Sequence, residues 1–232
     1  MKNTDFKLVV FDMAGTVVNE DNVVYKTIRE ALEKHGFSFS LDRVLAIAGG
    51  KEKLEAINDL LADIEVINPP LAESIHGEFK ENLKEKYQIQ SLGSFEGVES
   101  MITRLRDNGI KVVLNTGYDT ETATSILKKM KWNKGTHYDA LVAADNVVNG
   151  RPAPEMIQLA MEQFGINNPS EVVKVGDSII DIEEGKNAGC GLTIAVTSGA
   201  HNENQLQSVQ PDLILKSLAN LDEVLLGSET LS

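Results

Sequence analysis

The sequence predicts an α/β protein with a doubly wound, Rossmann-like parallel sheet and an inserted helical cap. Short runs rich in valine, isoleucine and leucine alternate with amphipathic segments, which is typical of βαβ units. One long stretch after the first of these runs breaks the alternation and has a helical periodicity throughout. A chain of 232 residues with 42% hydrophobic content is long enough for one substantial core and a smaller module.

The apolar runs are predicted to be buried parallel strands, because such strands read as continuous hydrophobic segments. They lie at 7–12, 111–117, 140–145, 172–177 and 192–198. The amphipathic segments between and after them are predicted helices. These lie at 98–108, 120–130, 155–164, 179–188 and 218–226.

The region from residue 21 to about residue 88 is the predicted cap. Apolar positions such as Val24, Ile28 and Leu32 recur there on one helical face. Small, polar and glycine residues interrupt the periodicity at 17–19 and 91–97. We therefore expect a catalytic core of residues 1–17 and 93–232 and a helical cap domain of residues 18–92.

Composition excludes several partners and compartments. The formal net charge of -13, without a cluster of lysine and arginine, argues against a nucleic-acid partner. No apolar stretch is long enough to span a bilayer, and the N-terminal apolar run is too short for a secretory signal. The single cysteine, Cys190, cannot form an intramolecular disulfide. These features predict a cytoplasmic protein that acts on a small molecule.

Polar residues stand where the predicted strands end, which is the edge at which open α/β sheets bind ligands. Asp12 ends the first strand, Thr116 and Gly117 end the second, and Asp177 ends a later one. Asp12 and Asp177 could together hold one Mg²⁺, with a backbone carbonyl and waters completing its octahedron. Such a metal neutralises charge on a phosphoryl or phosphonyl oxygen.

In order and spacing, these residues resemble the four motifs of the haloacid dehalogenase superfamily across nearly the whole chain. A lone Asp-x-x-Gly-Thr would fit a capped strand-to-helix turn equally well, whereas four motifs together are specific. The resemblance implies Asp12 as nucleophile and the carboxylates of Asp12 and Asp177 with the Ala14 carbonyl as metal ligands. It also implies the following supporting roles: Thr116 and Gly117 hold the phosphoryl oxygens, Arg151 stabilises the charged intermediate, and Asp181 supports the ligands from behind. Alternatively, Asp181 is a helix N-terminal acid that favours the macrodipole.

Two departures narrow the resemblance. Ala14 stands where phosphatases of this superfamily carry a second aspartate as general acid, and Arg151 stands where most members carry lysine. Both features resemble the phosphonatase branch, which includes the phosphonoacetaldehyde hydrolases, and in which a cap lysine forms a Schiff base. The matching position in this sequence is Lys53. We expect Gly50, which is close to it, to contact the substrate together with Gly117 and Tyr118.

A lysine suits that chemistry because cleavage of a carbon-phosphorus bond expels a carbanion, which an iminium converts into an enamine. If residues 51–61 form one helix, Lys53 lies at the edge of its apolar face and Lys51 points away. Partial desolvation would lower the pKa of Lys53 and free its amine. A surface lysine that snorkels over apolar side chains is the alternative interpretation. Ala56 also departs from the branch, which has a histidine there.

The expected function is therefore hydrolysis of a small 2-oxoalkyl phosphonate such as phosphonoacetaldehyde, with Mg²⁺, an Asp12 covalent intermediate and a Lys53 Schiff base. Three alternatives stay open: a Mg²⁺-dependent hydrolase of small phosphate esters, a metal-independent haloacid dehalogenase, and a non-catalytic binding protein. The last would be expected to lose Asp12 or Asp177, and neither is lost. The expected partner is a small anionic substrate, and the resemblance also allows a cap-mediated homodimer.

The four histidines lack metal-ligand spacing, so we expect each to lie on the surface or to pack against neighbouring side chains.

Overall fold

The computed structural model describes residues 5–89 and 91–227, and its centre is a six-stranded parallel sheet. The strand order is β5-β4-β1-β6-β7-β8. The strands are β1 (Leu8–Asp12), β4 (Lys111–Thr116), β5 (Ala140–Ala143), β6 (Val172–Gly176), β7 (Leu192–Val196) and β8 (Leu213–Leu215). The predicted doubly wound α/β fold is confirmed, while the predicted ends of the core at 1–4 and 228–232 lie outside the described residues.

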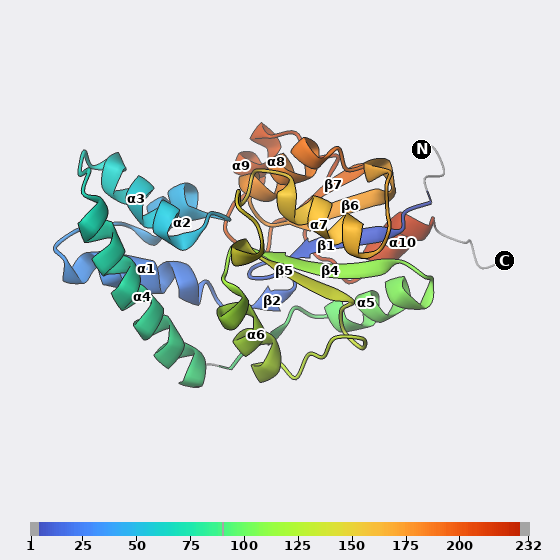
Figure 1. Ribbon diagram of the computed structural model, residues 1–232, viewed down its shortest axis with the longest axis horizontal. Helices are drawn as coiled ribbons and strands as arrows, with labels where there is room; N and C mark the ends of the chain where they lie inside the picture. Colours follow the sequence, from blue (N-terminus) through green and yellow to red (C-terminus); the bar gives the residue numbers. More distant parts are fainter. Residues whose placement is uncertain (1–4, 90, 228–232) are drawn as a thin grey trace.

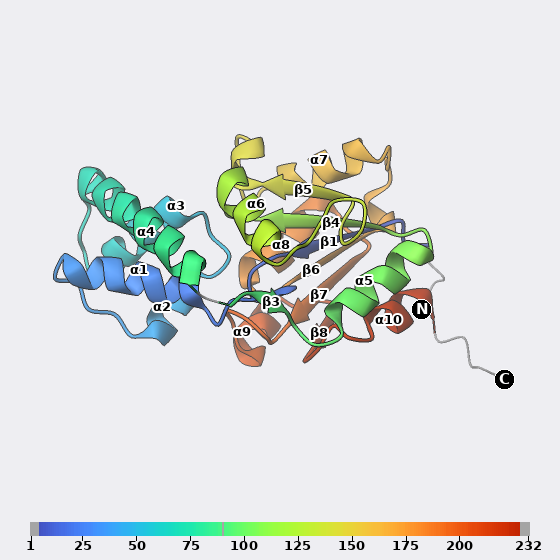
Figure 2. The same cartoon turned by 90° about the horizontal axis from the view of Figure 1, so that it is seen from below.

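Helices cover both faces of this sheet (Figures 1 and 2). Val9 and Phe11 of β1 pack in one cluster of buried side chains, and Leu8 and Val10 pack in another on the opposite face. The first face carries α5 (Val98–Asp107), α6 (Thr120–Lys129) and α10 (Leu221–Leu226). The second carries α7 (Glu155–Gln163), α8 (Ile179–Ala188) and α9 (Glu203–Ser208). Short 3₁₀ turns occupy Ala144–Asn146 and Pro169–Glu171. Burial on both faces explains the uninterrupted apolar sequence of β1.

The inserted segment forms a separate helical lobe beside the sheet (Figure 1). It consists of α1 (Val23–Lys34), α2 (Leu41–Ala48), α3 (Lys53–Asp63) and α4 (Pro69–Ile89). A short antiparallel pair, β2 (Val18–Asn19) with β3 (Gly93–Ser94), joins this lobe to the core. The helical cap is thus confirmed as an insert after β1. The predicted domain boundaries at 17/18 and 92/93 fall at this pair of strands and stay a prediction.

The structure differs from the sequence-based prediction in three elements. The helix expected from residue 51 begins at Lys53, because the Glu52 side chain caps it by accepting the Glu55 N–H at 2.9 Å. Lys51 therefore lies in the preceding turn. The pattern also missed α9 and β8; the latter has three half-buried residues and so no continuous apolar run. Among the described residues, no helix combines the length and apolar character needed to cross a membrane.

Candidate active site

The carboxyl ends of β1, β4 and β6 bring the predicted core residues together. β1 pairs with both β4 and β6, so Asp12, Thr116 and Asp177 meet at one edge of the sheet. All three side chains are buried. Thr16, in the loop after β1, places its hydroxyl 3.3 Å from Asp12 Oδ2 and 3.2 Å from Asp177 Oδ1. The loop thereby holds the two carboxylates next to each other.

These carboxylates fit a divalent cation. Oxygens of Asp12, Asp177 and Asp181 lie within 4.8 Å of one another. Burial, and then the neighbouring carboxylates, raise the pKa of Asp12 and raise that of Asp177 well above its usual value. Two buried acids that repel each other are the environment that a hard cation such as Mg²⁺ relieves, and Ala14 lines the same cavity. The residues present therefore suit a magnesium ion.

Asp181 differs from the other two acids because cations already surround it. Its Oδ1 contacts Arg151 Nη1 and lies 3.1 Å from Lys174 Nζ, and its Oδ2 accepts the Ser178 hydroxyl at 2.5 Å. Burial alone would raise its pKa, but Lys174 and Arg151 lower it to about 2. This environment favours a supporting position for Asp181 behind the metal ligands.

Arg151 reaches the nucleophile position from the loop before α7. Its Nη1 donates to Asp12 Oδ1 at 2.8 Å, and the guanidinium is buried. A Cβ on Gly117 would lie 3.0 Å from Arg151 Nη2, so this glycine permits the close approach. Among the described residues, Arg151 Nε has no hydrogen-bond partner. A buried, unpaired donor beside two carboxylates suits an anionic oxygen of a substrate.

Lys53 comes from the cap and lies in the same cavity as Asp12. It is 7% exposed, its Nζ donates to the Lys51 carbonyl at 2.6 Å, and the ammonium lies 5.5 and 5.4 Å from the ring centroids of Tyr25 and Tyr118. Burial, and then the charge of Arg151, lower the pKa of Lys53 to about 8. Lys51 instead pairs with Asp59 and stays partly exposed. The structure thus separates the two lysines, although not through the single helix that the sequence suggested.

The turn before α3 presses the cap onto the core. Gly50 has φ +76°, and a Cβ there would lie 2.2 Å from Ser178 Oγ. A Cβ on Gly117 would lie 3.2 Å from the Lys51 carbonyl oxygen. Only residues without side chains allow these two surfaces to meet so closely.

One small cavity of about 10 Å³ collects the predicted site residues. Asp181 does not line it; the lining consists of Asp12, Ala14, Tyr25, Gly50, Lys53, Thr116, Gly117, Tyr118, Arg151 and Asp177. This volume holds about one water molecule. A phosphonate or phosphate ester is larger than this volume, so we expect the cap to move away from the core when a substrate enters.

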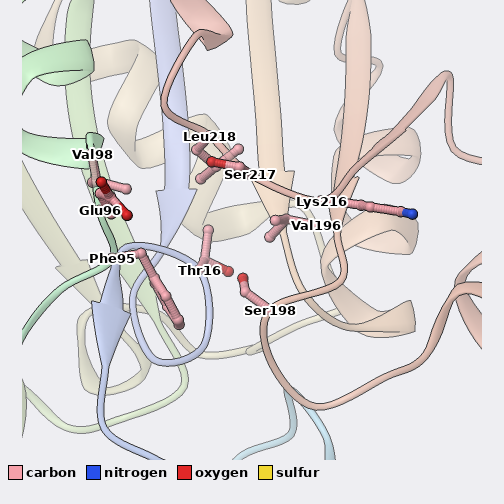
Figure 3. Close-up of a pocket in the computed structure, with 9 residues that line it drawn as sticks. All are labelled: Thr16, Phe95, Glu96, Val98, Val196, Ser198, Lys216, Ser217 and Leu218. Carbon is pink, nitrogen blue, oxygen red and sulfur yellow. The ribbon is translucent and has the colours of Figure 1, made fainter.

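A larger cavity of about 180 Å³ lies on the other side of the loop after β1. Figure 3 shows Phe95, Thr16 and Ser198 around it, while the amine of Lys216 points away. Of its lining residues, Thr16 also contacts the carboxylates of Asp12 and Asp177, and Ser198 donates to the Gly15 carbonyl at 2.6 Å. This cavity contains none of the residues that the sequence predicted for catalysis.

Sequence reasoning missed several residues that shape the site. In the sequence, nothing distinguishes Thr16 from an ordinary loop residue or Tyr25 from an ordinary helix residue, and Lys174 lies in a predicted strand. Glu20 lies in the polar segment that joins the core to the cap. All are buried next to predicted residues. A charged residue inside an apolar run is the one available signal, and it applies only to Lys174 in β6.

Comparison with known proteins agrees with this geometry. Residues 6–189 match the family model of haloacid dehalogenase-like hydrolases. A phosphonoacetaldehyde hydrolase from Latilactobacillus sakei is 30% identical over 238 residues, which covers 95% of this chain and 87% of that protein. A pyrophosphatase PpaX from Halalkalibacterium halodurans is 26% identical over 221 residues, covering 95% of this chain and 97% of that protein. The crystal structure of a phosphonoacetaldehyde hydrolase-like protein from Oleispira antarctica shares the fold, with a TM-score of 0.83 and 21% identity over 95% of this chain and 91% of that one.

Proposed function

Because the chain belongs to the haloacid dehalogenase-like hydrolases, we propose that it is a Mg²⁺-dependent hydrolase that cleaves the carbon-phosphorus bond of a small 2-oxoalkyl phosphonate such as phosphonoacetaldehyde. The observation that carries this proposal is the position of Lys53. A buried cap lysine with a pKa of about 8 lines the same cavity as Asp12. Such an amine is available to an aldehyde near neutral pH.

The residues divide the reaction between cap and core. Lys53 condenses with the aldehyde, and the iminium then accepts the electron pair of the breaking carbon-phosphorus bond as an enamine. Asp12 forms the new oxygen-phosphorus bond in line with the bond that breaks. Thr116, Gly117 and Arg151 hold the phosphoryl oxygens. Water hydrolyses the aspartyl phosphate, and protonation and hydrolysis of the enamine give acetaldehyde and regenerate Lys53.

Mg²⁺, bound by Asp12, the Ala14 carbonyl and Asp177, would supply charge neutralisation at phosphorus. Asp181 holds Arg151 and does not bind the metal in this scheme. Ala14 supports the scheme, because it cannot protonate an oxygen leaving group, whereas an enamine leaves without prior protonation.

A Mg²⁺-dependent hydrolase of small phosphate esters or pyrophosphate is the second candidate, and the likeness to a pyrophosphatase favours it. A haloacid dehalogenase would use Asp12 on carbon without a metal, so Mg²⁺ dependence separates it from both. The cap-mediated homodimer stays a prediction, for which light scattering is the test.

Borohydride trapping tests the proposal. With phosphonoacetaldehyde present, reduction should inactivate the protein and place the mass label on the peptide that contains Lys53. Lys53→Arg should lose label and turnover, because a guanidinium does not form an imine. Lys51→Arg is the matched control and should keep both, since Lys51 lies outside the cavity lining. Absence of an adduct, together with Mg²⁺-dependent hydrolysis of phosphate esters, would reject the phosphonatase and favour the second candidate.

A further inference from the structure

Glu20 is a buried acid that the scheme above leaves without a role. It lies between β2 and α1, at the crossing from core to cap, and is 3% exposed. Its carboxylate accepts the Tyr87 hydroxyl from α4 in a short hydrogen bond. The Tyr118 hydroxyl, from the loop after β4, lies 3.3 Å from Oε2 and 3.4 Å from Oε1. Glu20 is thus held between a cap tyrosine and a core tyrosine.

The same tyrosine connects this acid to Lys53. The Lys53 ammonium lies 5.4 Å from the Tyr118 ring centroid, and the Tyr118 hydroxyl contacts Glu20. The negative charge of Glu20 acts on Lys53, and the positive charge of Lys53 acts on Glu20. Of the other acids near this cavity, Asp12 pairs with Arg151 and Asp181 pairs with Lys174. Among the described residues, Asp12 and then Glu20 are the buried acids whose charges raise the pKa of Lys53, and only Asp12 is held by an arginine of the core.

We propose that Glu20 is the proton partner of Lys53: the two buried groups share one proton, and Lys53 becomes a free amine when Glu20 holds it. This inference rests on the proposed Schiff-base function and assigns Glu20 as a positioning residue for it. Glu20 does not line the cavity, so it acts on Lys53 and not on the substrate directly.

The pKa values of the two groups agree with such sharing. Burial raises the pKa of Glu20 to about 7, and burial followed by the Arg151 charge lowers that of Lys53 to about 8. The usual values of 4.5 and 10.5 differ by 6.0. The buried environment therefore brings the two pKa values much closer together than in water, which favours transfer of a proton between the groups. Because the transfer leaves the net charge unchanged, it adds no charge to the buried site.

The proton balance of imine formation closes with this pair. Lys53 as ammonium gives a proton to the Glu20 carboxylate, and the neutral amine adds to the aldehyde carbon. The protonated Glu20 returns that proton as the carbinolamine hydroxyl leaves as water. The products are the iminium, water and the Glu20 carboxylate, so every proton of the starting ammonium is accounted for.

The groups that face Glu20 preserve this exchange. Among the described residues they include Tyr87 from α4, Tyr118 after β4, Lys53 from α3, Asp12 from β1 and Tyr25 from α1. Burial raises the pKa of all three tyrosines well above the usual value, so their hydroxyls stay protonated near neutral pH. The hydroxyls of Tyr87 and Tyr118 donate to the Glu20 carboxylate, and after rotation either can accept from the protonated acid.

The pH dependence of Lys53 labelling tests the proposal independently of the substrate. Reductive methylation with formaldehyde and cyanoborohydride, followed by peptide mass mapping from about pH 6 to 10, reports the fraction of free amine. In the wild type, the labelling of Lys53 should have its midpoint near pH 8. Glu20→Gln removes the anion that favours the ammonium, so the midpoint should move down by at least about half a unit. Glu20→Asp should restore it toward the wild-type value.

The turnover profile gives the second readout. With phosphonoacetaldehyde, the wild type should show a bell-shaped profile, because the reactive state holds one proton on the pair. In Glu20→Gln, the alkaline limb of this pH profile should disappear. Its kcat should fall by about a hundredfold, with little change in KM. Tyr87→Phe removes a donor that lowers the pKa of Glu20, so its acid limb should move upward. This second variant tests the proposal even if Glu20→Gln fails to fold.

Glu52→Gln is the matched control, because Glu52 also acts on Lys53 but lies at the partly exposed start of α3. It should leave the labelling midpoint almost unchanged. An unshifted labelling midpoint in Glu20→Gln, a bell-shaped profile with wild-type kcat in Glu20→Gln, or an unshifted acid limb in Tyr87→Phe would overturn the proposal. If wild-type protein gives no adduct with phosphonoacetaldehyde, the Schiff-base function fails, while the formaldehyde midpoint still decides whether Glu20 controls the Lys53 proton.

Discussion

Replacement of Gly50 by alanine should separate cap closure from protein stability. An alanine there must keep φ near +76°, which costs about 1–2 kcal/mol for a residue with a Cβ. Its Cβ would also lie 2.2 Å from Ser178 Oγ and 3.0 Å from Ser178 Cβ. Since ordinary carbon-oxygen contacts are about 3.4 Å or longer, the turn and core must separate by about 1 Å. A displacement of this size at the turn before Lys53 should lower kcat/KM by about a hundredfold.

Gly36→Ala is the matched control for the backbone strain. Gly36 has φ +87°, also lies in the cap, and has no atom within 4 Å of its ideal Cβ among the described residues. Both variants should lose about 1–2 kcal/mol in urea unfolding, but only Gly50→Ala should lose turnover in a phosphate-release assay. If kcat/KM of Gly50→Ala lies within about threefold of that of Gly36→Ala, close docking of this turn is not needed for catalysis and the reasoning is wrong.

Two further predictions concern the core. Mg²⁺ at about a hundredfold its dissociation constant should stabilise the protein by about 2.7 kcal/mol, which corresponds to a rise of about 5–10 °C in Tm. Asp177→Asn should abolish this rise in a thermal melt. An equal rise in the variant would exclude Asp177 as a ligand. Lys174→Met should lower the free energy of unfolding by about 3–5 kcal/mol. It removes the ammonium that now lies 3.1 Å from Asp181 Oδ1 and 2.9 Å from Glu184 Oε2. Denaturant unfolding measures the loss, and Lys174→Met/Glu184→Leu should recover part of it; a neutral single variant would contradict the role of this buried ion cluster.

The core half of the site was predictable because sheet geometry alone places it. Parallel strands have their carboxyl ends at one edge, so residues that follow apolar runs converge even when far apart in sequence. Asp12 and Thr116 are the last residues of neighbouring strands, and Asp177 follows the strand on the other side of β1. Their chemistry could thus be proposed before any contact was known.

The cap half depended on contacts that the sequence does not encode locally. The buried Glu20 is bonded by Tyr87 and Tyr118, which lie 67 and 98 positions away in the sequence. For Lys53, the helical-face argument selected the lysine that lines the cavity, although the helix it assumed begins two residues too early. The actual cap is a glutamate, Glu52, a residue type that is not among the preferred N-caps. The burial of Lys53 follows from cap docking, which a periodicity argument does not include.

The closed site explains why arginine, and not lysine, suits position 151. Gly50 touches Ser178, whose hydroxyl donates to Asp181, and Asp181 shares Arg151 Nη1 with Asp12. Cap docking and the charge on the nucleophile are therefore joined by one chain of contacts. Nη1 is occupied by these carboxylates, whereas Nε has no partner among the described residues. In the proposed reaction Nε would donate to a phosphoryl oxygen. A lysine would direct all of its donors from a single nitrogen, so it could not reproduce this planar arrangement of donors on separate nitrogens.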